Sequence, residues 1–247
     1  MNQQTPVLEL TGIEKRFGPI TALSGVDLTL QAGEVLGVVG DNGAGKSTLM
    51  KVISGAYVPD GGTYRLDGEE VRFRSPADAR AQHLEMVYQD LSLCDTIDVA
   101  RNLFLGREPT RRILGLPLLD HAKLHSQAQE VLERLQIKVP STHAKVKNLS
   151  GGQRQAIAIG RSVASDPKVL ILDEPTAALA VKEVGEVLDL IRRLKSHGVG
   201  VILISHRLQD VLEVTDRIMF MFEGRKVAER PTSDTDLEEV IKLIVQA

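Results

Sequence analysis

The amino-acid sequence predicts an α/β protein built on a parallel β-sheet, with an antiparallel β subdomain near the N-terminus and a helical insertion subdomain. Three observations lead to this fold class. The first third of the chain is rich in strand-like patterns, the middle third has helical periodicity, and short apolar runs alternate with helical segments through the last third. Apolar strands that alternate with helices are typical of a parallel sheet covered on both faces.

Strand patterns dominate the first third. Val26–Leu30 alternates apolar and polar side chains with period two, as a half-exposed strand does. Val35–Val39 is an apolar run that ends in a glycine-rich loop. The other elements predicted here are a weak strand at Val7–Leu10, a helix at Lys46–Ser54, and a hairpin of Thr63–Leu66 and Val71–Phe73 around Asp67-Gly68.

Helical periodicity marks the middle of the chain, and predicted strands and helices alternate again after it. Apolar residues at Leu124, Ala128, Val131, Leu132 and Leu135 recur with helical spacing, which predicts an amphipathic helix. Pro109 and Pro117 punctuate a loop before it. The last third then predicts strands at Val169–Leu172, Val199–Ile204 and Ile218–Phe222, helices at Val184–Leu194, Arg207–Val214 and Leu237–Val245, and a turn at Glu223-Gly224.

Composition narrows the class of protein. The 247 residues are 43% hydrophobic and 26% charged, as in an ordinary globular protein. A formal net charge of −3 indicates neither a nucleic-acid-binding surface nor a polybasic membrane anchor. Cys94 is the single cysteine, which fits a reducing compartment. We expect no signal peptide and no membrane span, so work at a membrane would require docking on a partner that crosses it.

A glycine-rich loop follows the strand Val35–Val39. Gly40-Asp41-Asn42-Gly43-Ala44-Gly45-Lys46-Ser47 matches the pattern G-x-x-x-x-G-K-[ST] between a strand and a helix. Glycines allow the backbone N–H groups to point at phosphate oxygens, and the following helix adds the positive end of its dipole. Lys46 is expected to reach the β- and γ-phosphates of ATP, and the Ser47 hydroxyl to bind Mg²⁺.

Polar residues end three other strands. Val169–Leu172 runs into Asp173 and Glu174, of which Asp173 suits the surroundings of Mg²⁺ and Glu174 can polarise an attacking water. His206 follows another core strand and could hydrogen-bond the γ-phosphate, because ligands bind at the carboxyl ends of strands in such sheets. Gln89 follows Met86–Tyr88 and could reach Mg²⁺ or the water. Solvated acids, a structural histidine and a surface glutamine are the alternatives.

A second anion site is predicted at the start of another helix. In Leu149-Ser150-Gly151-Gly152-Gln153, Ser150 is a good N-cap residue and the two glycines leave backbone N–H groups bare. A nucleotide fold with one complete site does not need this second anion site. A capped helix with a flexible entry is the alternative interpretation.

In their order and spacing these motifs make the sequence resemble an ATP-binding cassette (ABC) ATPase over residues 7–225. The resemblance implies one cassette domain, with a P-loop NTPase core at 7–90 and 161–225, a helical subdomain at about 91–160, and a C-terminal tail with a helix at 226–247. It implies that Glu174 is the catalytic base and His206 the switch histidine, with Lys46 and Gln89 also catalytic. Ser47, Gln89 and Asp173 are the expected Mg²⁺ ligands.

The resemblance also implies a head-to-tail homodimer. Ser150–Gln153 of one copy would contact the γ-phosphate of ATP held by Gly40–Ser47 of the other, which explains the surplus anion site. Phe17 matches the aromatic side chain that stacks on adenine. The nucleotide-contacting residues expected on this basis are Phe17, Gly40, Asp41, Asn42, Gly43, Ala44, Gly45, Lys46, Ser47, Thr48, Ser150, Gly151, Gly152 and Gln153.

Further segments resemble bacterial monosaccharide importers of the ribose, xylose and fructose type. They are Asp41–Lys51, Val71–Pro76, Asn102–Glu108 and Glu174–Leu179. Two cassettes are usually fused in that family, so this chain looks like the single-cassette branch, which includes fructose importers. The partners implied are a second copy, two membrane permease subunits and a periplasmic or extracellular sugar-binding protein, with no nucleic acid. The implied location is the cytoplasmic face of the bacterial inner membrane, as a peripheral subunit.

One departure concerns communication between the two sites. Many family members have an aspartate a few residues after the catalytic glutamate, where this chain has Ala180. Monosaccharide importers often vary there, so the change bears on how tightly the two sites are coupled.

Two other functions compete with sugar import. A non-transport ABC ATPase acting on DNA or ribosomes would have long coiled coils between the phosphate loop and Leu149–Gln153, or two cassettes in one chain, and the sequence shows neither. A cassette that binds nucleotide without hydrolysing it is disfavoured because Lys46, Asp173, Glu174 and His206 are all present.

Overall fold

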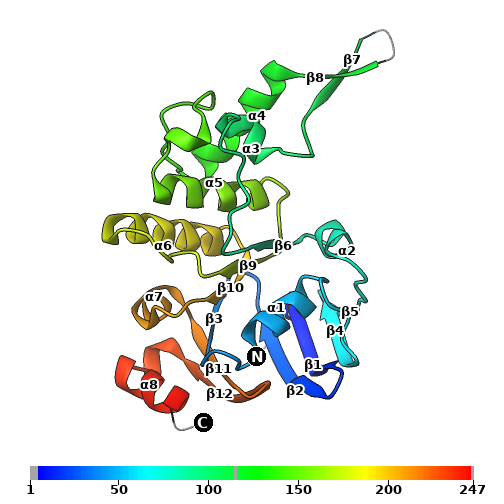
Figure 1. The fold of residues 1–247 in the computed structure, drawn as a ribbon, viewed down its shortest axis with the longest axis vertical. Helices are drawn as coiled ribbons and strands as arrows, with labels where there is room; N and C mark the ends of the chain where they lie inside the picture. The colour runs from blue at the N-terminus through cyan, green and yellow to red at the C-terminus, as the bar shows by residue number, and fades with distance from the viewer. Residues whose placement is uncertain (1–4, 114–115, 246–247) are drawn as a thin grey trace.

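The computed structural model describes residues 5–113 and 116–245. The chain forms two β-sheets with helices packed around them, and a hairpin projects from the helical part (Figure 1). Within the described residues, no helix is both long enough and apolar enough to cross a membrane.

The larger sheet has six strands in the order β12-β11-β3-β10-β9-β6. Five of them run parallel, and only β12 pairs antiparallel, with β11. The strands are β3 (Val35–Val39), β6 (Leu84–Val87), β9 (Val169–Asp173), β10 (Gly200–Ile204), β11 (Arg217–Phe222) and β12 (Arg225–Pro231). The predicted parallel sheet is therefore confirmed, with an antiparallel edge strand that the sequence did not reveal.

Successive side chains of the central strands enter different cores, because side chains alternate across a sheet. Leu170 and Leu172 pack with the helices of one face, whereas Val169 and Ile171 pack against α1 (Lys46–Ile53) and the smaller sheet. Both faces are therefore buried, which explains why β9 reads as a continuous apolar run rather than an alternating pattern. The polar residues Asp173 and Glu174 come where this run leaves the core.

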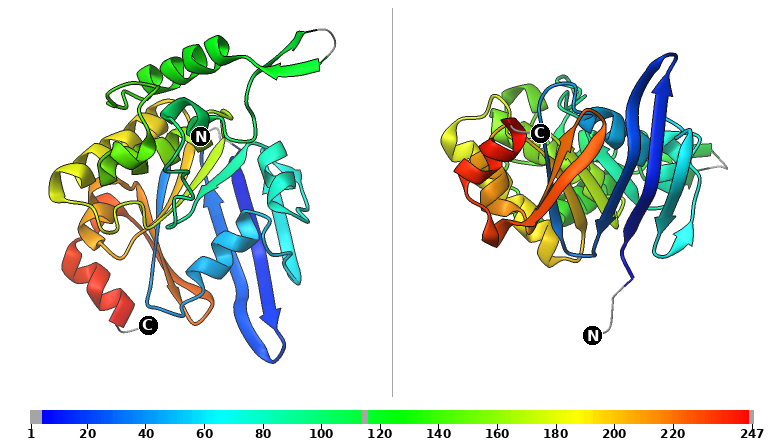
Figure 2. Two further views of the ribbon diagram at one scale, coloured as in Figure 1. Left: turned by 45° about the horizontal axis from the view of Figure 1, so that its top comes forward. Right: turned by 90° about the horizontal axis from the view of Figure 1, so that it is seen from below.

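The smaller sheet is antiparallel, with strand order β2-β1-β4-β5. Its strands are β1 (Leu8–Phe17), β2 (Ile20–Leu30), β4 (Gly61–Leu66) and β5 (Glu69–Glu70). It lies beside the edge of the larger sheet (Figure 2). The predicted hairpin around Asp67-Gly68 is present, but its second strand is β5, and the prediction of a strand at Val71–Phe73 is wrong. The pairing ends after the Val71 N–H donates to the Tyr64 carbonyl oxygen at 2.9 Å, and the chain then turns to the capped start of α2 (Pro76–Ala81), where Ser75 accepts a hydrogen bond from the Asp78 N–H.

Helices are the main regular structure in the middle of the chain, although loops and a hairpin make up more of this segment than the prediction of a mostly helical middle allowed. The segment contains α3 (Val99–Leu103), α4 (His121–Arg134), a 3₁₀ turn η1 (Val146–Asn148) and α5 (Gly151–Val163). The buried residues of α4 are Leu124, Ala128, Val131 and Leu132. The segment punctuated by Pro109 and Pro117 is not a plain loop: it forms a hairpin of β7 (Thr110–Ile113) and β8 (Leu116–Leu119), which projects from the body (Figure 1).

The last third supplies the remaining helices. They are α6 (Val181–Ser196), α7 (Leu208–Val214), a 3₁₀ turn η2 (Thr232–Asp234) and α8 (Leu237–Val245). Helix α6 lies between α5 and the larger sheet (Figure 1), and it packs against both α5 and β10. Residues 226–231, which lie in the tail expected at 226–247, belong to β12 at the sheet edge.

Candidate active site

The glycine-rich loop connects β3 to α1, so its backbone N–H groups gather at the start of a helix. The Lys46 ammonium group donates hydrogen bonds to the carbonyl oxygens of Gly40 at 2.6 Å and Asp41 at 2.9 Å. These bonds hold the base of the loop closed around the lysine side chain. The loop therefore presents a concave row of backbone donors with one cation at its centre.

Two glycines of the loop are required by close backbone contacts. A Cβ atom on Gly40, whose φ is 149°, would lie 2.2 Å from the Met221 carbonyl oxygen. A Cβ atom on Gly45, whose φ is 99°, would lie 2.9 Å from the Ala22 carbonyl oxygen. Only glycine fits both positions, because other residues rarely adopt such φ angles and would also collide with backbone atoms.

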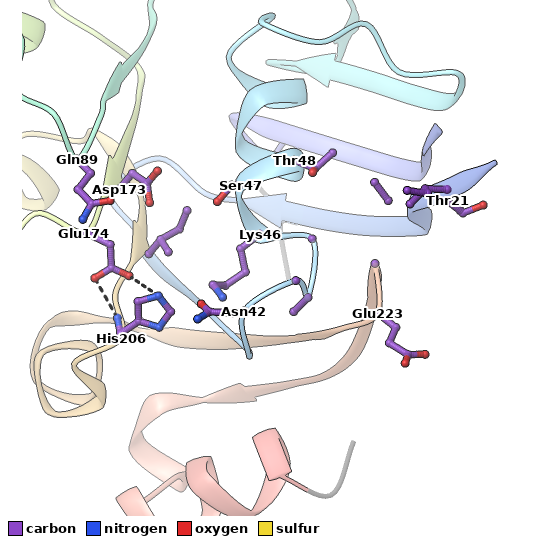
Figure 3. Close-up of a pocket in the computed structure, with 17 residues that line it drawn as sticks. Thr21, Asn42, Lys46, Ser47, Thr48, Gln89, Asp173, Glu174, His206 and Glu223 are labelled. Carbon is purple, nitrogen blue, oxygen red and sulfur yellow. Dashed lines mark hydrogen bonds and ion pairs between the residues drawn. The ribbon is translucent and has the colours of Figure 1, made fainter. Parts of the chain in front are cut away.

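A cavity of about 610 Å³ opens over this loop. It brings together residues from the first, second and last thirds of the chain, and Figure 3 shows how their side chains face one another. The expected site residues that line it are Asn42, Gly43, Ala44, Gly45, Lys46, Ser47, Thr48, Gln89, Asp173, Glu174 and His206. Gly40 and Asp41 lie at its base through their carbonyl contacts with Lys46.

The Glu174 carboxylate lies beside His206 at the cavity wall (Figure 3). The backbone N–H of His206 donates to Oε2 at 3.1 Å, and Nε2 of the ring lies 3.3 Å from Oε1. The Oε1 atom is buried and has no hydrogen bond of good geometry. Glu174 also has a left-handed backbone with φ of 52°, which is unusual for a residue other than glycine. The carboxylate is thus directed into the cavity with one oxygen available to a further donor.

Burial shifts the pKa values of the charged groups in the cavity. The pKa of Glu174 and that of Asp173 both lie above their ordinary values, because burial disfavours the carboxylate form. His206 and Lys46 partly oppose this shift for both acids. The pKa of Lys46 is lowered by burial, against the attraction of Glu174, Asp41 and Asp173. Glu174 is therefore a stronger base than an exposed glutamate.

The donor set suits magnesium. Ser47, Gln89 and Asp173 offer hydroxyl, amide and carboxylate oxygens to one cavity (Figure 3). The described residues contain no cluster of three or more His, Cys, Asp or Glu side chains that could hold a metal alone. Mg²⁺ is bound by one or two carboxylates together with water and substrate phosphates rather than by a complete protein cage. The residues present therefore fit this ion.

Five expected nucleotide contacts lie outside the cavity. Among the described residues that line it, none belongs to Ser150–Gln153, and Phe17 is also absent. Ser150 begins α5, where its Oγ accepts from the Gln153 N–H at 3.3 Å and the Gln153 side chain accepts from the Ser150 N–H at 3.0 Å. Phe17 is exposed at the end of β1, with its ring 5.2 Å from that of Tyr57.

Six residues that line the cavity were missed by the sequence analysis. Ile20, Thr21 and Ala22 come from β2, Ile204 ends β10, and Glu223 and Gly224 form the turn after β11. The Gly224 N–H donates to the Ala44 carbonyl oxygen at 3.0 Å, and the Ser24 N–H donates to that of Gly224 at 2.9 Å. The Glu223-Gly224 turn was visible in the sequence, but nothing there indicated that it packs on the phosphate loop.

Comparison with known proteins agrees with this geometry. Residues 23–177 match the family described as ABC transporter. The chain is 42% identical over 238 residues to the xylose/arabinose import ATP-binding protein XylG of Sulfolobus acidocaldarius, covering 96% of this chain and 93% of that protein. It is 43% identical over 248 residues to the fructose import ATP-binding protein FrcA of Rhizobium meliloti, covering 99% and 95%.

A third relative differs in length. The ribose import ATP-binding protein RbsA 1 of Rubrobacter xylanophilus is 43% identical over 240 residues, which are 97% of this chain but only 47% of that protein. Among solved structures, the ADP conformation of MJ1267, an ATP-binding cassette of an ABC transporter, superposes with a TM-score of 0.84 at 28% identity, covering 98% and 99% of the two chains. The chain therefore belongs to the ABC transporter family and is one of its nucleotide-binding ATPases.

Proposed function

We propose that this chain hydrolyses ATP to drive import of a monosaccharide through a membrane permease. The curated relatives of similar length are named for import of xylose or arabinose and of fructose, and a longer relative is named for ribose. These names share the substrate class, so we propose a monosaccharide, with fructose and xylose as the first candidates to assay.

The observation that carries the proposal is the arrangement of Lys46, Glu174 and His206 around one cavity. The loop N–H groups and Lys46 bind the phosphates, while Ser47, Gln89 and Asp173 hold Mg²⁺. The ion, when bound, neutralises phosphate charge and favours departure of the γ-phosphoryl group. Thr48, Asn42 and the remaining loop residues complete the phosphate contacts.

Glu174 is the proposed base for hydrolysis. Its raised pKa makes it able to accept a proton from a water molecule that attacks the γ-phosphate. His206 keeps that carboxylate in place by its backbone N–H and lends its ring to the γ-phosphate. Gln89 approaches the same cavity from the end of β6 and orients the water.

The position of Ser150–Gln153 outside the cavity supports a head-to-tail homodimer. The start of α5 can attract an anion, but it does not line the cavity over the phosphate loop of its own chain. We propose that these four residues complete the site of a second copy, and that Phe17 stacks on the adenine.

The proposed division is a nucleotide-binding core at 7–90 and 161–225, a helical subdomain at about 91–160 and a C-terminal tail at 226–247. A cleft of about 820 Å³ lies between α2, the end of β6 and α5, and residues of the segment after Gln89 line it. We propose that one permease subunit docks in this cleft on each of the two copies, at the cytoplasmic face of the bacterial membrane. A sugar-binding protein would act through these two permease subunits.

The test is ATPase activity of the complex reconstituted with its permease and binding protein in lipid vesicles. We expect a monosaccharide-loaded binding protein to stimulate hydrolysis, and Lys46→Ala to abolish it. A panel of fructose, xylose, arabinose and ribose identifies the substrate. Hydrolysis that is indifferent to permease, binding protein and every sugar would contradict the coupling role.

A further inference from the structure

The Glu183 carboxylate lies close to the N-termini of both α5 and α6. Helix α6 begins after Ala180, whose side chain offers no acceptor for the free N–H groups of the first turn. Glu183, three residues on, accepts the N–H of Ala180 itself at 3.2 Å through Oε2. The Glu183 carboxylate is therefore held at the start of α6.

The same side chain covers the start of α5. A Cβ atom on Gly152 would lie 2.8 Å from Cβ of Glu183, and one on Gly151 would lie 3.4 Å from its Oε2 atom. Gly151 and Gly152 thus admit the Glu183 side chain at the N-terminus of α5. A Cβ atom on Gly151 would also lie 3.2 Å from Cδ2 of Leu179, which is in the segment that leads from Glu174 to α6.

The carboxylate is charged in this position. The pKa of Glu183 is held below its usual value, first by hydrogen bonding from the Gly152 N–H, then by the Ser150 hydroxyl and the Ala180 N–H. The positive charge of Arg154 adds to this effect. Backbone N–H groups of a helix start favour an anion, and here an anion of the same chain already lies against them.

We propose that Glu183 is an internal anion at the α5 N-terminus which weakens its attraction for the nucleotide phosphate of a second copy. This inference rests on the proposed composite site. The carboxylate lies against Gly151 and Gly152, where the phosphate would approach the α5 N-terminus, and its negative charge repels the phosphate. Because Glu183 also binds Ala180, a phosphate that displaces it loosens the start of α6, which follows Glu174 in the chain. Glu183 is thus a positioning residue that sets the affinity of pairing.

Glu183→Gln tests the charge alone, because the amide oxygen still accepts from Ala180. We compare Glu174→Gln with the double variant Glu174→Gln/Glu183→Gln, measuring ATP-dependent dimerisation by analytical ultracentrifugation. We expect the ATP concentration for half-maximal dimerisation to fall about 3- to 10-fold in the double variant. The matched control is Glu130→Gln in the same background, which removes one exposed carboxylate from α4 and should leave that concentration unchanged.

Salt dependence separates repulsion from a structural effect. Salt screens the repulsion between like charges. The difference in half-maximal ATP concentration between Glu174→Gln and Glu174→Gln/Glu183→Gln should therefore become smaller as ionic strength rises. The thermal midpoint is measured for each variant, and Glu183→Ala serves as a second variant without the Ala180 contact. An equal or higher ATP requirement in Glu183→Gln than in its parent would overturn the role of Glu183. Absence of ATP-dependent dimers in every variant would instead contradict the composite site.

Discussion

The Glu174 carboxylate accepts a hydrogen bond from the His206 backbone N–H through Oε2 at 3.1 Å and lies beside the His206 ring, with Oε1 at 3.3 Å from Nε2. The two residues follow neighbouring parallel strands, β9 and β10, so their separation in sequence disappears at the sheet edge. A carboxylate fixed in this way is directed at the phosphate loop without losing its ability to accept a proton.

Replacing Glu174 by glutamine should separate binding from hydrolysis. The amide has nearly the same shape and can still accept from the His206 N–H, but it does not take a proton from water. We expect the rate of phosphate release to fall about 100- to 10,000-fold while ATP affinity is kept. Unchanged turnover, measured beside an ATP-binding titration, would remove Glu174 from the role of base.

His206→Ala should have a smaller effect than loss of the base. The backbone N–H of residue 206 still holds Oε2, whereas the contact to Oε1 and the ring that faces the phosphate are lost. We expect turnover to fall about 10- to 100-fold, mainly through the maximal rate. The control is His197→Ala, which removes an exposed histidine at the end of α6 whose ring contacts the Arg193 carbonyl oxygen. A similar loss in both variants would indicate a general effect on the fold.

Stability should depend on pH through Glu174. Its pKa is raised on folding by burial, so above the ordinary value of 4.5 the unfolded chain gives up this proton before the folded chain does. The folded state therefore binds more protons in that range, and the free energy of unfolding falls as pH rises from about 4.5 to the folded pKa. In urea unfolding at several pH values, the free energy of unfolding should fall less steeply with rising pH for Glu174→Gln than for the unchanged protein. At pH 7 and without nucleotide, the variant should be the more stable of the two. Parallel pH profiles would contradict the raised pKa.

Arg161 should stabilise the helical part of the protein. Its guanidinium group donates to the carbonyl oxygens of Leu91 at 2.8 Å and Ser92 at 2.9 Å, and so ties α5 to the segment after Gln89. Arg161→Ala leaves both acceptors without this donor, so we expect a loss of about 1–3 kcal/mol in the free energy of unfolding. The comparison is Arg134→Ala, which breaks a more exposed pair with Asp166 and should cost less. Equal losses in the free energy of unfolding for the two variants, measured by urea titration, would contradict a larger stabilising effect of the Leu91 and Ser92 contacts.

Local patterns were sufficient to predict elements whose apolar side chains are buried in a core. The run Val169–Leu172, buried on both faces, and the helical spacing from Leu124 to Leu135 reappear as β9 and α4, because apolar patterns report burial directly. The hairpin β7–β8 was missed because Leu116 and Leu118 are exposed and their pattern reports no core. The strand β12 was missed because it lies at a sheet edge, where one neighbour suffices and the apolar signal is weak.

Sequence alone identified the candidate groups of the site: a phosphate loop with its lysine, an acidic pair, a histidine and a second helix start suited to an anion. Each is recognisable because its chemistry depends on neighbours within a few residues. Only the tertiary structure decided which of these groups meet. It set Glu174 against His206 and the Glu223-Gly224 turn against the phosphate loop, kept Ser150–Gln153 outside that cavity, and laid Glu183 over Gly151 and Gly152. Strand order and helix packing make those contacts between segments far apart in the chain, and no local pattern encodes them.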